Sequence, residues 1–112
     1  MNLKGERVAS DLIKELSSIF LTEVKDEDLK NVTLTFATVT NDLSFAKVYF
    51  TTLDDHKKEK VLKDINNASG YFRTELAKRL EIRHIPEIKF VYDDSIEYGK
   101  KIEKIVEEIN KN

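Results

Sequence analysis

The fold is limited most by two alternating segments near the middle of the chain, joined by a very short link. Residues 32–39 (VTLTFATV) place apolar side chains on one face and threonines on the other. Residues 43–53 (LSFAKVYFTTL) are again rich in β-branched and aromatic residues, which favour strands. The link at 40–42 (TND) has turn chemistry, because Asn and Asp side chains bond nearby backbone. The pattern predicts an antiparallel hairpin with a loop longer than the tightest turns.

Helical periodicity surrounds this hairpin. Apolar residues recur at helical spacing over 4–24, 56–68, 71–81 and 95–110, which predicts four helices. The residues expected to face inward are Val8, Leu12, Ile13, Leu16, Ile19 and Phe20 in the first helix; Val61, Ile65, Ala68, Phe72, Leu76 and Leu80 across the two middle ones; and Ile102, Ile105, Val106 and Ile109 in the last.

The remaining segments complete the element order. Residues 24–31 are charged and aperiodic, so we expect a loop there. Pro86 precedes a third alternating segment, which predicts a strand over 87–92. Asp94 and Glu97 have the spacing of a capping box at the start of the last helix.

The predicted order is therefore α-β-β-α-α-β-α, in one domain over residues 1–112. Three strands cannot hide two faces, so we expect helices packed on one face of a single-layer, three-stranded α+β sheet. The absence of cysteine excludes disulfides and cysteine-based zinc sites. No segment resembles an export signal or a membrane span, which predicts a cytosolic protein.

Gly70 is unusual because it lies inside a continuous helical pattern, where glycine costs about 1 kcal/mol relative to alanine. One interpretation is that Gly70 ends the first helix in a left-handed conformation while Ser69 caps the second. Such a kink would present unpaired backbone N–H groups that attract phosphate. The alternative is that the glycine is a C-cap with no further role.

Charge is distributed unevenly along the chain. The net charge is −2, but residues 56–90 carry 9 basic and 5 acidic side chains, a local balance of +4. Because charges act only over about 10 Å at physiological salt, this stretch can still face an anion. The basic residues near Gly70 are Lys57, Lys58, Lys60, Lys63, Arg73, Lys78, Arg79 and Arg83. The alternative is an ordinary solvated helix face.

Four pieces of the sequence, in order and correctly spaced, resemble the ribosome-binding factor A family. They are RVASDLIKEL at 7–16, VTLTFATVTNDLSFAKVYFT at 32–51, ASGYFRTEL at 68–76 and RHIPEIKFVYDDSIEYGKKI at 83–102. The resemblance implies a type II KH-like domain, in which an Ala-x-Gly kink replaces the G-x-x-G loop of ordinary KH domains. In this sequence that kink is Ala68, Ser69 and Gly70.

The resemblance also implies a function. Such a protein would bind the immature 30S small ribosomal subunit and its 16S rRNA, and would assist maturation of the RNA's 5′ region without catalysis, cofactor or metal. It would act as a monomer, with ribosomal proteins and an assembly GTPase as further partners to consider. We expect RNA contacts from Lys60, Lys63, Ala68, Ser69, Gly70, Arg73, Lys78, Arg79 and Arg83.

Other functions have weaker support in the sequence. His56 and His84 stand 28 residues apart, which fits no metal-ligand spacing, and Asp93 and Asp94 are better placed to cap a helix than to act as paired carboxylates. Among the aromatic residues that could stack on bases (Tyr49, Tyr71, Phe72 and Tyr92), Tyr71 is the best candidate, because Phe72 belongs to the apolar stripe. A protein–protein interaction domain that never contacts RNA is the main alternative.

Overall fold

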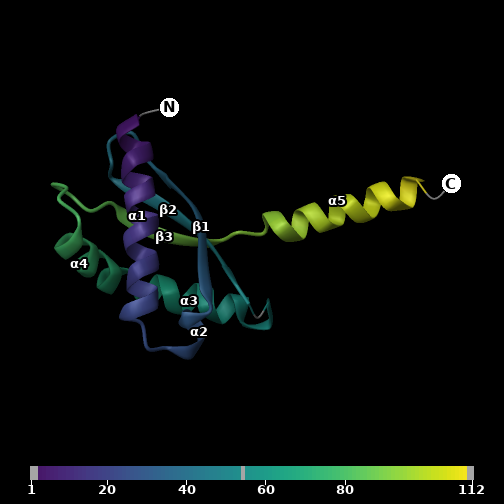
Figure 1. Cartoon of the computed structure of the whole chain (residues 1–112), viewed down its shortest axis with the longest axis horizontal. Helices are drawn as coiled ribbons and strands as arrows, with labels where there is room; N and C mark the ends of the chain where they lie inside the picture. The colour runs from purple at the N-terminus through teal and green to yellow at the C-terminus, as the bar shows by residue number, and fades with distance from the viewer. Residues whose placement is uncertain (1–2, 54, 111–112) are drawn as a thin grey trace.

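The structure is a computed structural model that describes residues 3–53 and 55–110. Its elements follow the predicted order, with two short additions (Figure 1). They are α1 (Leu3–Thr22), α2 (Glu27–Lys30), β1 (Val32–Val39), β2 (Phe45–Thr52), a 3-10 turn (Asp55–Lys57), α3 (Lys58–Asn67), α4 (Ser69–Arg79), β3 (Glu87–Tyr92) and α5 (Ser95–Asn110).

The three strands form one sheet in the order β1-β2-β3. β1 and β2 are antiparallel, with Val39 opposite Ala46, so the predicted hairpin is confirmed. β3 runs parallel to β2, because α3 and α4 carry the chain back before it enters the sheet. The register of β1 shifts between Leu34 and Phe36, where a bulge interrupts the pairing.

One face of the sheet is covered and holds the core. Alternate residues of β2 and β3 point toward α1, α3 and α4, and these helices cover that face. The rings of Phe20, Phe72 and Phe90 meet at the centre, with centroids 4.9 Å (Phe20–Phe72) and 5.5 Å (Phe72–Phe90) apart. The other buried apolar residues are Val8, Leu12, Leu16, Ile19, Leu29, Ala37, Ala46, Val48, Phe50, Val61, Ile65, Leu76 and Ile88. The α+β prediction is therefore confirmed.

The segment predicted as a loop over 24–31 contains a short helix, so that prediction was wrong in part. Asp26 caps α2: its carboxylate accepts hydrogen bonds from the backbone N–H groups of Asp28 (2.9 Å) and Leu29 (3.3 Å). Leu29 is buried in the core. A single helical turn has no period to detect in a sequence, which is why the segment looks aperiodic.

The junction between α3 and α4 lies at Ala68, so the predicted roles of Ser69 and Gly70 as caps are wrong. Ala68 has φ −91° and ψ 6°, and no side chain caps α4 there. Gly70 lies in the first turn of α4, and its φ is not positive. Because the N–H of Ala68 bonds to Asp64 and its carbonyl accepts from Phe72, the chain bends while keeping near-helical angles. No left-handed residue is required.

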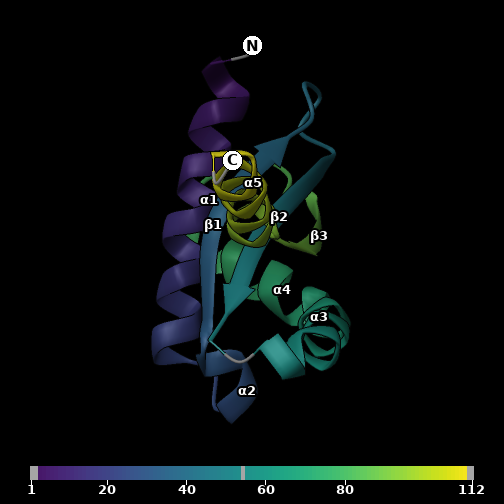
Figure 2. The same ribbon diagram turned by 90° about the vertical axis from the view of Figure 1, so that its right-hand side faces the viewer.

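α5 has the predicted bounds, but the prediction that its apolar residues face inward was wrong. The exposed fractions of Ile102, Ile105, Val106 and Ile109 are 44%, 52%, 47% and 66%. The helix projects away from the body in Figure 1 and is seen end-on in Figure 2. The radius of gyration is accordingly 16.3 Å, against about 13 Å for a compact domain of this length. The sequence specifies an apolar helix face but not what it contacts.

Asp93 fixes the point where α5 leaves the sheet. Its carboxylate accepts hydrogen bonds from the Thr35 hydroxyl (2.6 Å) and from the backbone N–H of Ser95 (3.0 Å). These hydrogen bonds hold the pKa of Asp93 below its ordinary value. The expected capping box of Asp94 with Glu97 involves a side chain outside the described ones.

Candidate nucleic-acid interface

A cleft of about 420 Å³ separates α4 from the segment that follows it. Gly70 and Arg73 line it from α4, and Arg83 lines it from the segment that leads into β3. The other lining residues are Thr74, Ala77, Ile82, His84 and Ile85. The fold thus brings together three residues, Gly70, Arg73 and Arg83, that the sequence analysis expected to contact RNA.

Arg73 joins the two walls of the cleft. Its Nη2 donates a hydrogen bond to the backbone carbonyl of Ile85 at 3.1 Å. A guanidinium has five N–H donors in a planar fork, so the exposed remainder of this group is available to an anion. Arg83 is also exposed, and within the described residues it forms no ion pair.

Gly70 leaves the backbone accessible at one end of the cleft. A Cβ added there would meet nothing within 4 Å, so the surface in front of it is open. Its carbonyl accepts a hydrogen bond from the Thr74 hydroxyl at 3.0 Å. Ala68 and Ser69 are half-buried beside it. Gly70 therefore has an open surface in front of its backbone and does not adopt an unusual backbone angle.

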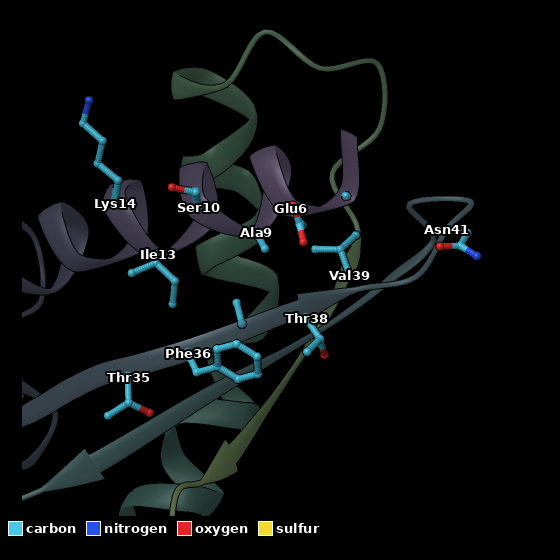
Figure 3. A pocket seen from close by; sticks show the side chains of 12 residues that line it. Glu6, Ala9, Ser10, Ile13, Lys14, Thr35, Phe36, Thr38, Val39 and Asn41 are labelled. Carbon is cyan, nitrogen blue, oxygen red and sulfur yellow. The ribbon is translucent and has the colours of Figure 1, made fainter. Parts of the chain in front are cut away.

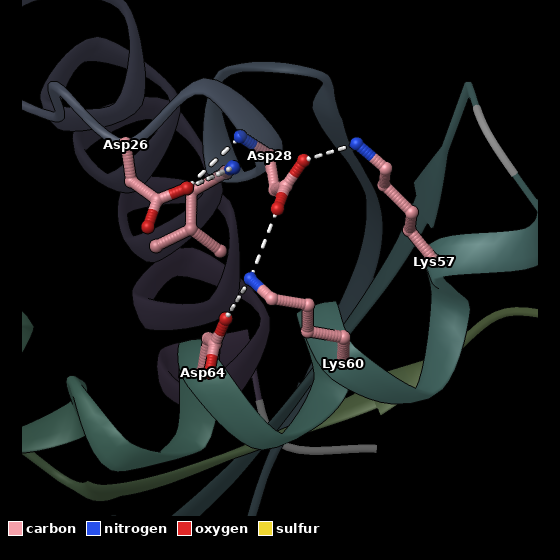
Figure 4. Close-up of polar contacts among 6 residues, drawn as sticks. Asp26, Asp28, Lys57, Lys60 and Asp64 are labelled. Carbon is pink, nitrogen blue, oxygen red and sulfur yellow. Dashed lines mark hydrogen bonds and ion pairs between the residues drawn. The ribbon is translucent and has the colours of Figure 1, made fainter.

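Lys60, by contrast, takes part in an ion-pair network between α2 and α3 (Figure 4). Its Nζ lies 2.9 Å from the carboxylate of Asp64 and 3.0 Å from that of Asp28, and Lys57 also contacts Asp28 at 2.9 Å. The bonds from Lys57 and Lys60 lower the pKa of Asp28. Those from Asp64 and Asp28 raise the pKa of Lys60. Lys63, one turn away from Lys60 on α3, is exposed and has no ion-pair partner among the described residues.

Arg79 and Lys78 at the end of α4 also face acidic partners. Arg79 contacts Glu15 (3.7 Å) and Glu23 (3.1 Å) and donates to the Ser18 hydroxyl (3.2 Å). Its side chain is only 25% exposed. Lys78 pairs with Glu75 on the same helix at 3.3 Å. Arg79 therefore connects α4 to α1. Of the cations expected to contact RNA, Lys60, Lys78 and Arg79 have acidic partners, whereas Lys63 and the two cleft arginines, Arg73 and Arg83, form no ion pair among the described residues.

The sequence analysis did not assign Thr74, His84 or Ile85 to the interface. The signal for His84 is its place in RHIP, next to Arg83 and just before Pro86. No group of His, Asp or Glu suited to holding a metal ion occurs in residues 3–53 and 55–110. Tyr71, the expected stacking residue, is 43% exposed. Burial, followed by the charges of Glu23 and Glu75, raises its pKa.

A larger groove of about 620 Å³ lies between α1 and β1 (Figure 3). Ala9 and Ile13 of α1 and Val39 of β1 give it an apolar lining, with Glu6, Ser10 and Lys14 on its α1 side. None of the residues expected to contact RNA lines it. No helix among the described residues has the length and apolar content to cross a bilayer.

The chain is similar to known proteins over most of its length. The family model described as ribosome-binding factor A matches residues 4–106. The chain is 41% identical to ribosome-binding factor A of Macrococcus caseolyticus, over 100% of this chain and 99% of that protein. It is 43% identical to the protein of the same name from Staphylococcus carnosus, over 97% of this chain and 96% of that protein.

Solved structures show the same fold. The crystal structure of ribosome-binding factor A from Thermus thermophilus superimposes with a TM-score of 0.71 and 20% identity, covering 79% of this chain and 93% of the other. A Thermus thermophilus ribosome binding factor A homology model, fitted into a cryo-EM map of a 30S–RbfA complex, gives a TM-score of 0.64 with 20% identity, covering 77% and 91%.

Proposed function

The chain belongs to the ribosome-binding factor A family, and on that premise we propose that it binds the immature small ribosomal subunit through its 16S rRNA. The observation that carries the proposal is the cleft in which Gly70, Arg73 and Arg83 meet. The names of the relatives describe binding factors rather than enzymes, and the Thermus protein was fitted into a map of its complex with the 30S subunit. Both observations support a role by binding without catalysis.

In this proposal the cleft binds the RNA backbone. Arg73 and Arg83 contact phosphate oxygens, where a planar fork can make two hydrogen bonds at once. The open surface at Gly70 lets the sugar–phosphate chain approach the first turn of α4, whose backbone N–H groups also favour anions. This is the part that the kinked helix pair of a type II KH-like domain would play.

Further details belong to the same proposal. The protein acts in the cytoplasm as a monomer, as a single domain over residues 1–112, and assists late maturation of the 5′ region of 16S rRNA. Lys63 supplies an additional phosphate contact, whereas Lys60, Lys78 and Arg79 contribute less because acidic side chains already neutralise them. Ribosomal proteins and an assembly GTPase are partners on the subunit.

The test is co-sedimentation of the purified protein with isolated small subunits and with whole ribosomes, at low and moderate salt. We expect binding to free or immature small subunits, weaker at higher salt because phosphate contacts release counterions. The variant Arg73→Gln with Arg83→Gln should lose most of this binding. Arg7→Gln with Lys25→Gln removes the same charge from exposed positions elsewhere and should bind like the wild type.

Two results would contradict the proposal. If the wild-type protein did not sediment with small subunits at any salt, the function would be wrong. If the cleft variant and the control variant bound equally well, the small subunit would be the partner but the cleft would not be the contact.

The α1–β1 groove and the exposed apolar face of α5 favour a second function, a protein–protein interaction domain that does not contact RNA. Such contacts bury apolar surface and depend little on salt. A small-subunit affinity that is unchanged between low and moderate salt, together with no affinity for protein-free 16S rRNA, would select this alternative.

A further inference from the structure

The face of the sheet that α1, α3 and α4 leave uncovered carries aromatic and basic side chains in rows. Phe36 of β1 is opposite Tyr49 of β2, and Lys47 of β2 is opposite Lys89 of β3. Phe45 extends the pattern at the start of β2. We refer to these residues, Phe36, Phe45, Lys47, Tyr49 and Lys89, as the aromatic sheet face.

Two aromatic residues of this face, Phe36 and Phe45, are exposed instead of contributing to the core, and Tyr49 is half-buried beside Phe36. Phe36 and Phe45 each have an exposed fraction of 56%. The ring centroids of Phe36 and Tyr49 lie 5.7 Å apart with an interplanar angle of 38°, so the two rings form a continuous apolar surface. Large exposed rings grouped on one face of a small protein indicate a binding surface.

The basic residues of the face lie between the aromatic rows. Phe45, Lys47 and Tyr49 are alternate residues of β2, so successive side chains on this face are about 7 Å apart. The lysine row therefore separates an aromatic row at Phe36 and Tyr49 from a second aromatic position at Phe45. The rings at Tyr49 and Phe45 therefore lie about 13 Å apart along β2, with a cation between them.

Lys47 and Lys89 face each other across neighbouring strands, instead of facing acidic residues. They occupy facing positions on neighbouring strands, about 5 Å apart across the ladder. Facing like charges destabilise a sheet. Both side chains are exposed, and within the described residues neither forms an ion pair. The nearest acidic position in the register is Glu87, opposite Phe45. A bound anion would relieve this repulsion.

We propose that the aromatic sheet face is a second RNA-binding surface, on which unpaired bases of a single strand stack on Phe36, Tyr49 and Phe45 while Lys47 and Lys89 bind the phosphate between them. Stacking on exposed aromatic residues of a sheet is a general mode of single-strand recognition. The proposal rests on the proposed function, because it adds a contact to the same RNA partner. The face lies on the opposite side of the sheet from α4 and its cleft, so one protein could hold two RNA segments.

The test is fluorescence anisotropy with labelled single-stranded oligonucleotides of about ten nucleotides and with a blunt RNA duplex of the same length. We expect Phe45→Ala and Phe36→Ala each to weaken single-strand binding by about 5- to 100-fold, the usual effect of removing one stacking ring. Phe45→Trp should retain the affinity, because a ring is restored. Lys47→Gln with Lys89→Gln should weaken binding and reduce its dependence on salt.

Controls separate stacking from other effects. Leu21→Ala removes an apolar side chain that is 86% exposed on α1, away from this face, and should leave single-strand affinity unchanged. Duplex binding should not respond to the aromatic substitutions, because paired bases cannot stack on the face. Circular dichroism of each variant verifies the fold, which we expect to persist because Phe36 and Phe45 are more than half exposed.

The outcomes distinguish this proposal from the proposed function. If both phenylalanine variants kept single-strand affinity within about two-fold of wild type, the aromatic sheet face would not bind RNA, whatever the cleft variants did in co-sedimentation. If the phenylalanine variants lost small-subunit binding but kept single-strand affinity, the face would contact a protein of the subunit and the proposal would be overturned. If the wild type failed to bind subunits but the ring substitutions still weakened single-strand binding, the result would support RNA binding by the aromatic sheet face and contradict the proposed function.

Discussion

The side-chain amide of Asn66 pairs with both backbone groups of Phe90. Asn66 Oδ1 accepts the N–H of Phe90 at 2.9 Å, and Asn66 Nδ2 donates to the carbonyl of Phe90 at 3.0 Å. Because β3 is an edge strand, this amide takes the position that a further strand would occupy. It fixes α3 against β3 and satisfies two partly buried backbone groups.

Replacing Asn66 with leucine should lower the free energy of unfolding by about 1–3 kcal/mol, because two partly buried groups of Phe90 lose their partners. The measurement is urea unfolding followed by circular dichroism. Asn67→Leu is the matched control, since Asn67 is exposed on the same helix and should change stability little. Equal effects of the two substitutions would show that the pairing with Phe90 is unimportant.

Replacing Arg79 with alanine should destabilise the fold by about 1 kcal/mol, because the side chain joins α4 to Glu15 and Glu23 near α1. A double-mutant cycle with Glu23→Gln measures the pair directly. A coupling energy near zero would mean that the pair contributes nothing. Arg79 is therefore a poor probe of RNA binding, since its removal changes stability as well as charge.

Asp28 should make stability depend on acid pH. Its pKa is held below the ordinary value by Lys57 and then Lys60, so the folded state binds its proton less readily than the unfolded state. The stabilisation is therefore complete above the ordinary carboxyl pKa of about 4 and is lost as the pH falls through the lowered folded pKa. Wild type should exceed Asp28→Asn in stability at pH 7, and the difference should shrink below about pH 4. A difference that is the same at pH 7 and pH 3 would assign the effect to packing instead.

Replacing Gly70 with alanine should raise the free energy of unfolding by up to about 1 kcal/mol, because the position is helical and a Cβ meets nothing there. The same variant should bind small subunits less well, since the methyl group projects in front of the cleft. Thermal unfolding and co-sedimentation measure the two effects. A lower melting temperature would show that the fold itself requires glycine here.

Apolar residues of α5 should matter little to the stability of the body. Ile105→Ala should change the free energy of unfolding by less than about 0.5 kcal/mol, because Ile105 is 52% exposed. Ile65→Ala, the same change at a fully buried position of α3, should cost about 2–5 kcal/mol. A loss at Ile105 comparable to that at Ile65 would mean that α5 packs against the body in solution.

The elements and their order follow from local pattern. Alternation over 32–39 and 87–92 and helical spacing over 95–110 place these elements within a residue of where they lie. α2 was missed because its stability comes from one cap at Asp26 and the burial of Leu29, neither of which repeats along the sequence. Of the expected RNA contacts, the cleft unites Gly70, Arg73 and Arg83. The helical pattern and the family's Ala-x-Gly kink indicated Gly70, and the local charge excess indicated the two arginines.

By itself, the sequence determined the longer helices and the strands, which face of each is apolar, and the family to which the chain belongs. These are properties of neighbouring residues, because a helix or strand repeats its side-chain directions every few positions. The tertiary structure decided which cations pair with acidic residues of other elements. Arg79 meets Glu23 and Lys60 meets Asp28 only because the fold brings distant residues together. It likewise decided that Asn66 closes the edge of β3 and that Ile102, Ile105, Val106 and Ile109 of α5 are largely exposed. Such pairings depend on how separate elements are arranged in space, and the local periodicity of the sequence contains no information about that arrangement.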